Sequence, residues 1–182
     1  MHVKICGITN LDDGLVAVEA GADLLGFILY PKSPRYIAPA AIARIVARIK
    51  TDHAPAIWCV GVFVNEPLEV IRTILAEASL DYAQLHGDEP PALLDALPGR
   101  AYKALRPATA AEAAAQANTF ARTVPAHGPR LMVDAYDPAE YGGTGKKADW
   151  TAAATLARRH PGLLLAGGLT PDNVAAAIRT VE

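Results

Sequence analysis

The sequence predicts an α/β fold built on a parallel sheet. Seven short runs of β-branched or apolar residues recur along the 182-residue chain, and alanine-rich segments with helical spacing separate them. Repeated alternation of strand and helix is typical of a parallel sheet covered by helices. The strand runs are apolar at successive positions, as expected where both faces of such a sheet are buried. Two architectures fit this pattern: a (β/α)₈ barrel and an open doubly wound sheet.

The predicted strands follow one another with a helix between each pair. In chain order they are Val3–Cys6, Leu24–Ile28, Ile57–Val64, Tyr82–Leu85, Tyr102–Leu105, Leu131–Val133 and Leu163–Leu165. Asn10 is expected to cap the first helix, which should stop at Gly21. Residues 41–49 place apolar side chains on one helical face, at Ile42, Ile45, Val46 and Ile49. Thr170 is expected to cap the last helix, with Pro171 at its first position.

Length, charge and cysteine content narrow the class of protein. A chain of 182 residues is expected to form one domain, spanning 1–182. Its net charge of −2 gives no global signature of nucleic-acid or membrane-surface binding. Cys6 and Cys59 are too few for a disulfide framework, so both are expected to be reduced. No apolar run approaches the length of a membrane helix, and Lys4 interrupts any signal peptide. We therefore expect a cytoplasmic location.

Polar and reactive residues follow most of the predicted strands. In both architectures the chemistry lies at the carboxyl ends of the strands, so these residues should gather on one rim. They are Cys6, Arg35, Asn65, His86, Arg106, Asp134, Lys146, Gly167 and Gly168. This concentration on one rim is typical of the active face of an enzyme.

Cys6 and Asp134 are the two candidates for proton transfer. Cys6 ends a strand and precedes a glycine, where a thiol can serve as a nucleophile or, when ionised, as a base. The alternative is a small buried hydrophobe, which describes Cys59 well. Asp134 ends an apolar strand, where partial burial would let it donate a proton near neutral pH. Its alternative role is to cap the segment that follows.

The glycine-rich segment after Asp134 resembles a phosphate loop but fails the Walker pattern. That pattern needs glycine where Glu140 stands and serine or threonine where Lys147 stands. The loop 135–149 is long, which favours an active-site lid. The candidate lid residues are Gly142, Gly143, Gly145 and Lys146.

Three other features can bind a ligand. Gly167 and Gly168 precede a helix and leave backbone amides for an anion, although a tight turn explains them as well. Arg35 can clamp a carboxylate or a phosphate, or it can be a solvated surface residue. His86 can orient a substrate or face solvent. No paired ligand spacing supports a zinc site, so no metal is expected from Cys6, Cys59, His53 and His86.

Together these motifs resemble the phosphoribosylanthranilate isomerase family of tryptophan biosynthesis. The matching segments occur in the family's order over nearly the whole chain, and their combination is highly specific. They are KICGIT (4–9), GFILYPKSPRYI (26–37), VGVFVN (60–65), QLHGDE (84–89), Asp134 with YGGTGK (141–146), and LAGGLTPDNV (165–174). The resemblance implies a (β/α)₈ barrel.

The resemblance also implies a reaction and a set of roles. The reaction is a cofactor-free Amadori rearrangement of N-(5-phosphoribosyl)anthranilate to 1-(2-carboxyphenylamino)-1-deoxyribulose 5-phosphate. The resemblance makes Cys6 the general base and Asp134 the general acid. It implies that Arg35 binds the anthranilate carboxylate and that Gly167 and Gly168 bind the phosphate.

The remaining implications concern partners and binding side chains. The QLHGDE segment adds Gln84 and His86 to the substrate-binding side chains. A small phosphosugar is the expected partner, with no cofactor, nucleic acid or membrane, and the protein is expected to be a monomer or a homodimer.

Two departures from the family pattern leave alternatives open. A closed barrel needs eight units and the sequence shows seven, so the eighth βα unit is expected to be missing from this chain. Lys147 and Ala148 stand where the family usually has threonine and phenylalanine, which bears on lid packing. The alternatives are another phosphosugar-binding barrel enzyme and a truncated, non-catalytic subunit that binds a phosphate ligand.

Overall fold

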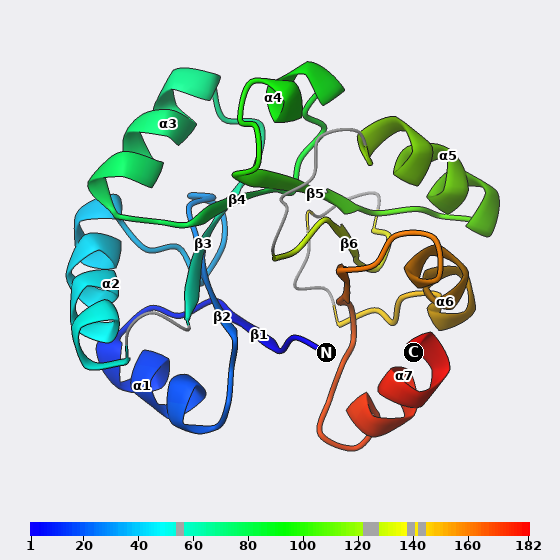
Figure 1. The fold of residues 1–182 in the computed structure, drawn as a ribbon, viewed down its shortest axis with the longest axis horizontal. Helices are drawn as coiled ribbons and strands as arrows, with labels where there is room; N and C mark the ends of the chain where they lie inside the picture. Colours follow the sequence, from blue (N-terminus) through cyan, green and yellow to red (C-terminus); the bar gives the residue numbers. More distant parts are fainter. Residues whose placement is uncertain (54–56, 122–127, 138–140, 142–144) are drawn as a thin grey trace. The chain divides into compact units, whose positions relative to one another are not determined.

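Parallel strands alternate with helices throughout the part of the chain that the structure describes, as the sequence predicts (Figure 1). The structure is a computed structural model, and it describes residues 1–53, 57–121, 128–137, 141 and 145–182. The strands are β1 (Lys4–Cys6), β2 (Leu24–Ile28), β3 (Trp58–Phe63), β4 (Tyr82–Leu85), β5 (Ala101–Leu105), β6 (Leu131–Val133) and β7 (Leu163–Leu165). The helices are α1 (Leu11–Glu19), α2 (Pro39–His53), α3 (Leu68–Glu77), α4 (Pro91–Asp95), α5 (Ala110–Phe120), α6 (Trp150–Ala157) and α7 (Val174–Val181).

The chain groups into two compact units, Met1–Glu89 and Pro90–Glu182. In the first unit, β1, β2, β3 and β4 pair in chain order, and every pair is parallel. In the second unit, β5 pairs with β6 and β6 with β7, again in parallel. The single domain over 1–182 stays a prediction. Parallel order within each unit places the carboxyl ends of its strands on a common rim, which is where the candidate residues lie.

The predicted signals at the first helix are confirmed. Asn10 caps α1, because its side-chain oxygen accepts a hydrogen bond from the Asp13 N–H at 2.8 Å. Gly21 ends the helix with φ +91°, a left-handed conformation that favours glycine. The chain then turns directly into β2.

The predicted apolar stripe over 41–49 is also confirmed, and it forms the inner face of α2. All four of its side chains are buried, with exposed fractions of 7% or less: Ile42, Ile45, Val46 and Ile49. In Figure 1, α2 and α3 lie along the outer side of the strands of the first unit. The second unit has its own core, in which β5 and β6 pack against α5 and α6; its buried residues include Leu105, Ala117, Leu131, Val133 and Ala153.

The predicted start of the last helix is wrong. The helix α7 begins at Val174 after a turn, not at Pro171. The Asn173 side chain accepts from the Thr170 N–H at 2.9 Å and donates to the Gly168 carbonyl at 2.8 Å. Asn173 therefore ties the turn back to the loop after β7, where the sequence assigned the cap to Thr170.

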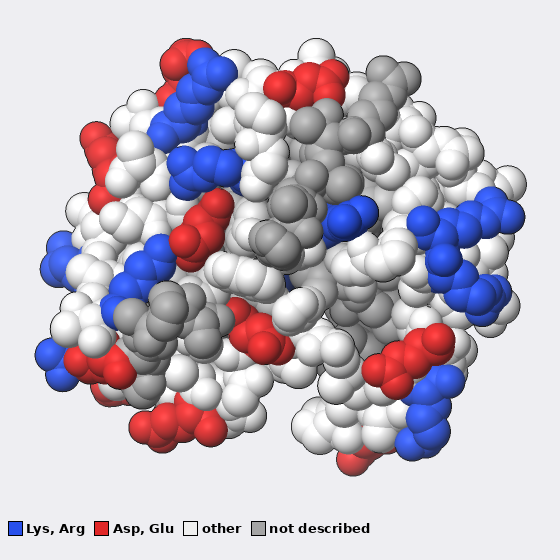
Figure 2. Space-filling view, viewed as in Figure 1, with Lys and Arg blue, Asp and Glu red and all other residues white. Residues whose placement is uncertain are grey.

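Strand burial agrees with a parallel sheet that is covered on both faces. Every residue of β2, β4, β5 and β6 is buried. The first and last strands differ, since Ile5 of β1 is 42% exposed and Leu163 and Leu165 of β7 are half-buried. Figure 2 shows acidic and basic side chains interspersed on the face in view, in line with the small net charge. None of the described helices has the length and apolarity needed to cross a membrane.

Asp81 ties three elements of the first unit together. Its carboxylate accepts from the Cys59 N–H of β3 at 2.7 Å and from Lys50 Nζ of α2 at 2.8 Å. Asp81 itself stands directly before β4. Because the carboxylate is half-buried, losing it leaves a backbone donor and an ammonium without their shared acceptor.

We predict that Asp81→Ala lowers the free energy of unfolding by about 2 kcal/mol, since it removes two charge-assisted hydrogen bonds. Urea unfolding measures the change. The matched control is Glu69→Ala, which breaks the exposed Glu69–Arg72 pair of 2.9 Å on α3 and should change the free energy by less than about 0.5 kcal/mol. Equal effects of the two substitutions would contradict the structural role of Asp81.

Candidate active site

Cys6 lies at the carboxyl end of β1, directly opposite Gly26 of β2 in the parallel register. A Cβ atom on Gly26 would lie 2.6 Å from Cys6 Sγ and 2.7 Å from Lys4 Nζ. Both side chains therefore occupy the space that a larger residue at position 26 would fill. The Gly26 carbonyl also accepts from the Gly7 and Ile8 N–H groups, at 2.9 and 3.0 Å, which holds the loop after β1 against β2.

Arg35 lies against the backbone of Cys6 and Gly7. Its Nη1 donates to the Cys6 carbonyl oxygen at 3.0 Å. A Cβ on Gly7 would lie 2.7 Å from Arg35 Cδ and Nη1, and Gly7 has φ +95°. Glycine at position 7 therefore allows both the turn and the close approach of the guanidinium. The structure brings together two of the predicted residues, Cys6 and Arg35, in the first unit.

Gln84 and His86 are both buried at the end of β4. Gln84 Nε2 donates to His86 Nδ1 at 2.6 Å, which orients the imidazole and makes Nδ1 the acceptor. The alternative that His86 faces solvent is wrong, because its exposed fraction is 6%.

The turn after His86 is organised by two side chains. The buried Glu89 carboxylate accepts from the Asn65 and Gly87 N–H groups, at 2.9 and 3.0 Å. Asn65 Oδ1 accepts from the Asp88 N–H at 2.7 Å and lies where a Cβ of Gly87 would be. The loops after β3 and β4 are thus locked to each other. The sequence analysis assigns no role to Glu89. Its position in the turn between the buried strand β4 and the helix α4 is the signal that could have revealed this structural role.

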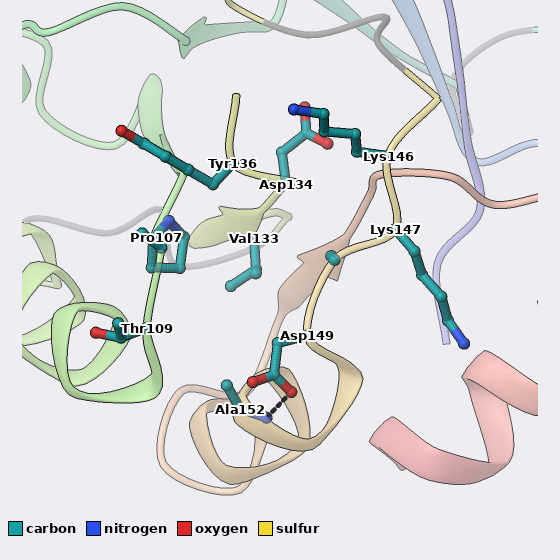
Figure 3. A pocket seen from close by; sticks show the side chains of 11 residues that line it. Pro107, Thr109, Val133, Asp134, Tyr136, Lys146, Lys147, Asp149 and Ala152 are labelled. Atoms are coloured by element: carbon teal, nitrogen blue, oxygen red, sulfur yellow. Dashed lines mark hydrogen bonds between the residues drawn. The ribbon is translucent and has the colours of Figure 1, made fainter. Parts of the chain in front are cut away.

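Asp134 follows β6 in the second unit and is half-buried. Its Oδ1 accepts from the Ala135 N–H at 2.7 Å. Asp134 lines a cavity of about 270 Å³ together with Tyr136 and Lys146. Figure 3 shows Lys146 and Asp134 pointing toward each other, while Asp149 turns away to cap α6 through the Ala152 N–H at 3.0 Å. The cap of the neighbouring helix α6 is therefore Asp149, and Asp134 Oδ1 accepts from the amide that follows it.

Gly167 and Gly168 bring the loop after β7 close to Asp134 and to the end of the lid loop. Both have positive φ, +90° and +63°. A Cβ on Gly167 would lie 2.6 Å from the Ala135 nitrogen and 3.0 Å from Asp134 Oδ1. A Cβ on Gly168 would lie 2.8 Å from the Lys146 carbonyl oxygen. Only residues without a side chain allow this packing of three backbone segments.

The candidate lid is described in part. Gly142 and Gly143 lie outside the described residues. Gly145 has φ +73°, and Lys146 Nζ forms an ion pair of 2.9 Å with the mostly buried Asp137. In the middle of the loop, the centre of the Tyr141 ring lies 4.3 Å from the guanidinium carbon of Arg106, a cation–π contact.

Cys59 is a structural cysteine, as expected. It is fully buried within β3. Burial first, and then the neighbouring Asp81 carboxylate, raise the pKa of the Cys59 thiol to about 12. Cys59 therefore stays protonated at neutral pH and cannot act as a base, whereas Cys6 lies on the rim.

Comparison with known proteins identifies the chain. The model of the N-(5'phosphoribosyl)anthranilate (PRA) isomerase family matches residues 3–182. An N-(5'-phosphoribosyl)anthranilate isomerase from Geobacter sulfurreducens is 45% identical over 182 residues, which cover 100% of this chain and 84% of the relative.

Solved structures agree with the sequence match. Phosphoribosyl anthranilate isomerase from Thermotoga maritima superposes with a TM-score of 0.83 at 38% identity, over 100% of this chain and 83% of that one. Another solved structure is of a phosphoribosyl anthranilate isomerase in complex with reduced 1-(o-carboxyphenylamino)-1-deoxyribulose 5-phosphate. It superposes with a TM-score of 0.79 at 36% identity, over 100% of this chain and 82% of that one.

The family model and the solved structures show an isomerase with a (β/α)-barrel-like fold, which decides between the two architectures that the sequence left open. The chain belongs to the N-(5'-phosphoribosyl)anthranilate isomerase family of tryptophan biosynthesis.

We predict that Gly167→Ala destabilises the protein and lowers its isomerase activity, because the new Cβ displaces Ala135 and Asp134. The matched control is Gly99→Ala, which also adds a Cβ at positive φ, +69°, but meets no atom within 4 Å. Backbone strain should make the control less stable by roughly 1 kcal/mol, and overpacking should add about 1–3 kcal/mol in Gly167→Ala. Urea unfolding and steady-state kinetics check both variants; equal losses would contradict the close contact at Gly167.

Proposed function

We propose that this isomerase converts N-(5'-phosphoribosyl)anthranilate to its 1-deoxyribulose product with Cys6 as general base and Asp134 as general acid. The observation that carries the proposal is the thiol at the end of β1, seated in the space left by Gly26 in the segment KICGIT. The relative that was solved with a reduced phosphosugar supports the class of substrate.

The proposed reaction needs one acid and one base. Asp134 gives a proton to the ring oxygen of the aminofuranose, which opens the ring to an iminium. The iminium acidifies the proton on sugar C2, and the Cys6 thiolate removes it. The resulting enolamine then tautomerises to the ketone. Acid–base steps of this kind need no cofactor and depend on placing each group at its own atom.

The other candidate residues bind the ends of the substrate in this proposal. Arg35 clamps the anthranilate carboxylate through its guanidinium fork. The amides of Gly167 and Gly168 bind the phosphate, and Asn173 supports them by holding the Gly168 carbonyl at 2.8 Å. Gln84 keeps His86 oriented toward the substrate, and the segment with Gly145 and Lys146 covers the site.

We also propose a cytoplasmic location and a phosphosugar as the main partner. The two cysteines are both unpaired, as a reducing compartment requires. The protein acts as a monomer or a homodimer.

We predict that Cys6→Ser and Asp134→Asn each lower kcat by at least about 10²-fold, because each removes a proton-transfer group and little volume. The assay follows the loss of anthranilate-type fluorescence when the protein meets substrate made in situ. Cys59→Ser is the matched control: its thiol is buried and protonated, so the variant that folds should keep its kcat. Near wild-type turnover in either rim variant rejects that residue's role.

We predict that Arg35→Met raises KM for the substrate by about tenfold, as expected for the loss of one carboxylate contact. Lys in place of Arg35 should recover part of the affinity, because it keeps the charge but loses the bidentate fork. Arg44→Met, which removes a charge from the exposed face of α2, is the control. An unchanged KM in Arg35→Met assigns the carboxylate to another group.

A further inference from the structure

The proposed mechanism gives no role to the ammonium group of Lys4. The side chain extends from β1 on the same face as Cys6, since the two residues are two positions apart on one strand. Lys4 Nζ has less than 1 Å² of exposed surface and no hydrogen-bond partner among the described residues. A buried ammonium without a partner is unfavourable, so a nearby anion is expected.

The ammonium and the thiol meet in one small space. Cys6 Sγ and Lys4 Nζ lie 2.6 and 2.7 Å from the position that a Cβ of Gly26 would take. They are therefore neighbours across the bare face of Gly26, with no side chain of β2 between them. A thiol beside an ammonium is favoured in its ionised form.

Few other charges face this pair in the described part of the first unit. The strand β2, Leu24–Ile28, carries no ionisable side chain. Arg35, from the loop after β2, binds the Cys6 carbonyl and is also positive. The carboxylate before β2, Asp23, accepts from the Val3 N–H at 2.7 Å and lies 3.9 Å from His2, at the amino end of the strands. Among the described residues of the first unit, the Cys6 thiolate is therefore the anion that is placed to pair with Lys4.

We propose that Lys4 is a positioning residue that pairs with the Cys6 thiolate across Gly26 and keeps Cys6 ionised as the base. The inference rests on the proposed role of Cys6 in the isomerisation. When Cys6 takes the proton from sugar C2, the thiolate becomes a neutral thiol and the ammonium loses its anion. This favours release of the proton from sulfur and readies Cys6 for the next turnover.

The test measures the rate at which iodoacetamide alkylates Cys6 as a function of pH, in the wild type and in Lys4→Met. Peptide mass analysis separates Cys6 from Cys59, whose buried thiol serves as the unreactive internal reference. We expect the half-maximal pH of Cys6 alkylation to rise by about one unit or more in Lys4→Met. At pH values below both midpoints, this shift corresponds to an alkylation rate about tenfold lower in Lys4→Met than in the wild type. Lys4→Arg should keep most of the wild-type value, and Arg44→Met should match the wild type.

The alkaline shift should also appear in the pH dependence of kcat/KM, where a merely structural role of Lys4 predicts no shift. Circular dichroism verifies that each variant is folded, and Lys4→Gln replaces Lys4→Met if the latter does not fold. An unchanged alkylation midpoint in the folded variant overturns the proposal for Lys4. Because alkylation needs no turnover, this result is independent of Cys6→Ser: full activity of Cys6→Ser would reject the base and leave the alkylation result standing.

Discussion

The pairing of Cys6 with Gly26 across β1 and β2 is the constraint on which the rim of the first unit depends. The parallel register puts a residue without a side chain opposite the thiol, and the space so created admits both Cys6 Sγ and Lys4 Nζ. The Gly26 carbonyl then anchors the following loop, over which Arg35 lies. Thiol, ammonium and guanidinium are thus placed by one register, and any slip of β1 along β2 would separate them.

Glycine residues also make room for close contacts in the second unit. Gly167 lets the loop after β7 approach the backbone of Asp134 and Ala135, and Gly168 lets it approach the end of the lid loop. Close packing of backbone segments leaves little freedom for the Asp134 side chain, whose Oδ1 is held by the next amide. In both units, therefore, a reactive side chain at the end of a strand is positioned by a neighbouring residue that has no side chain.

The sequence predicted the strands closely because continuous apolar runs allow little choice of boundary, and local caps such as Asn10 act within three residues. It could not predict contacts that depend on packing between elements. The start of α7 depends on Asn173, whose side chain reaches back to Gly168. The buried state of His86 depends on its environment at the end of β4. From the sequence, Lys4 is only a charge near the amino terminus, because its proximity to Cys6 follows from the register with Gly26 and not from a motif.

The proposed roles of Cys6 and Asp134 require that this chain isomerises its substrate. The most direct measurement mixes the purified 182-residue protein with N-(5'-phosphoribosyl)anthranilate made in situ and identifies the product by mass. We predict that anthranilate-type fluorescence is lost at a rate proportional to the protein concentration, above the spontaneous background. The product should have the mass of the substrate, since isomerisation only moves protons. A folded protein that leaves the substrate to hydrolyse to anthranilate at the background rate would contradict it.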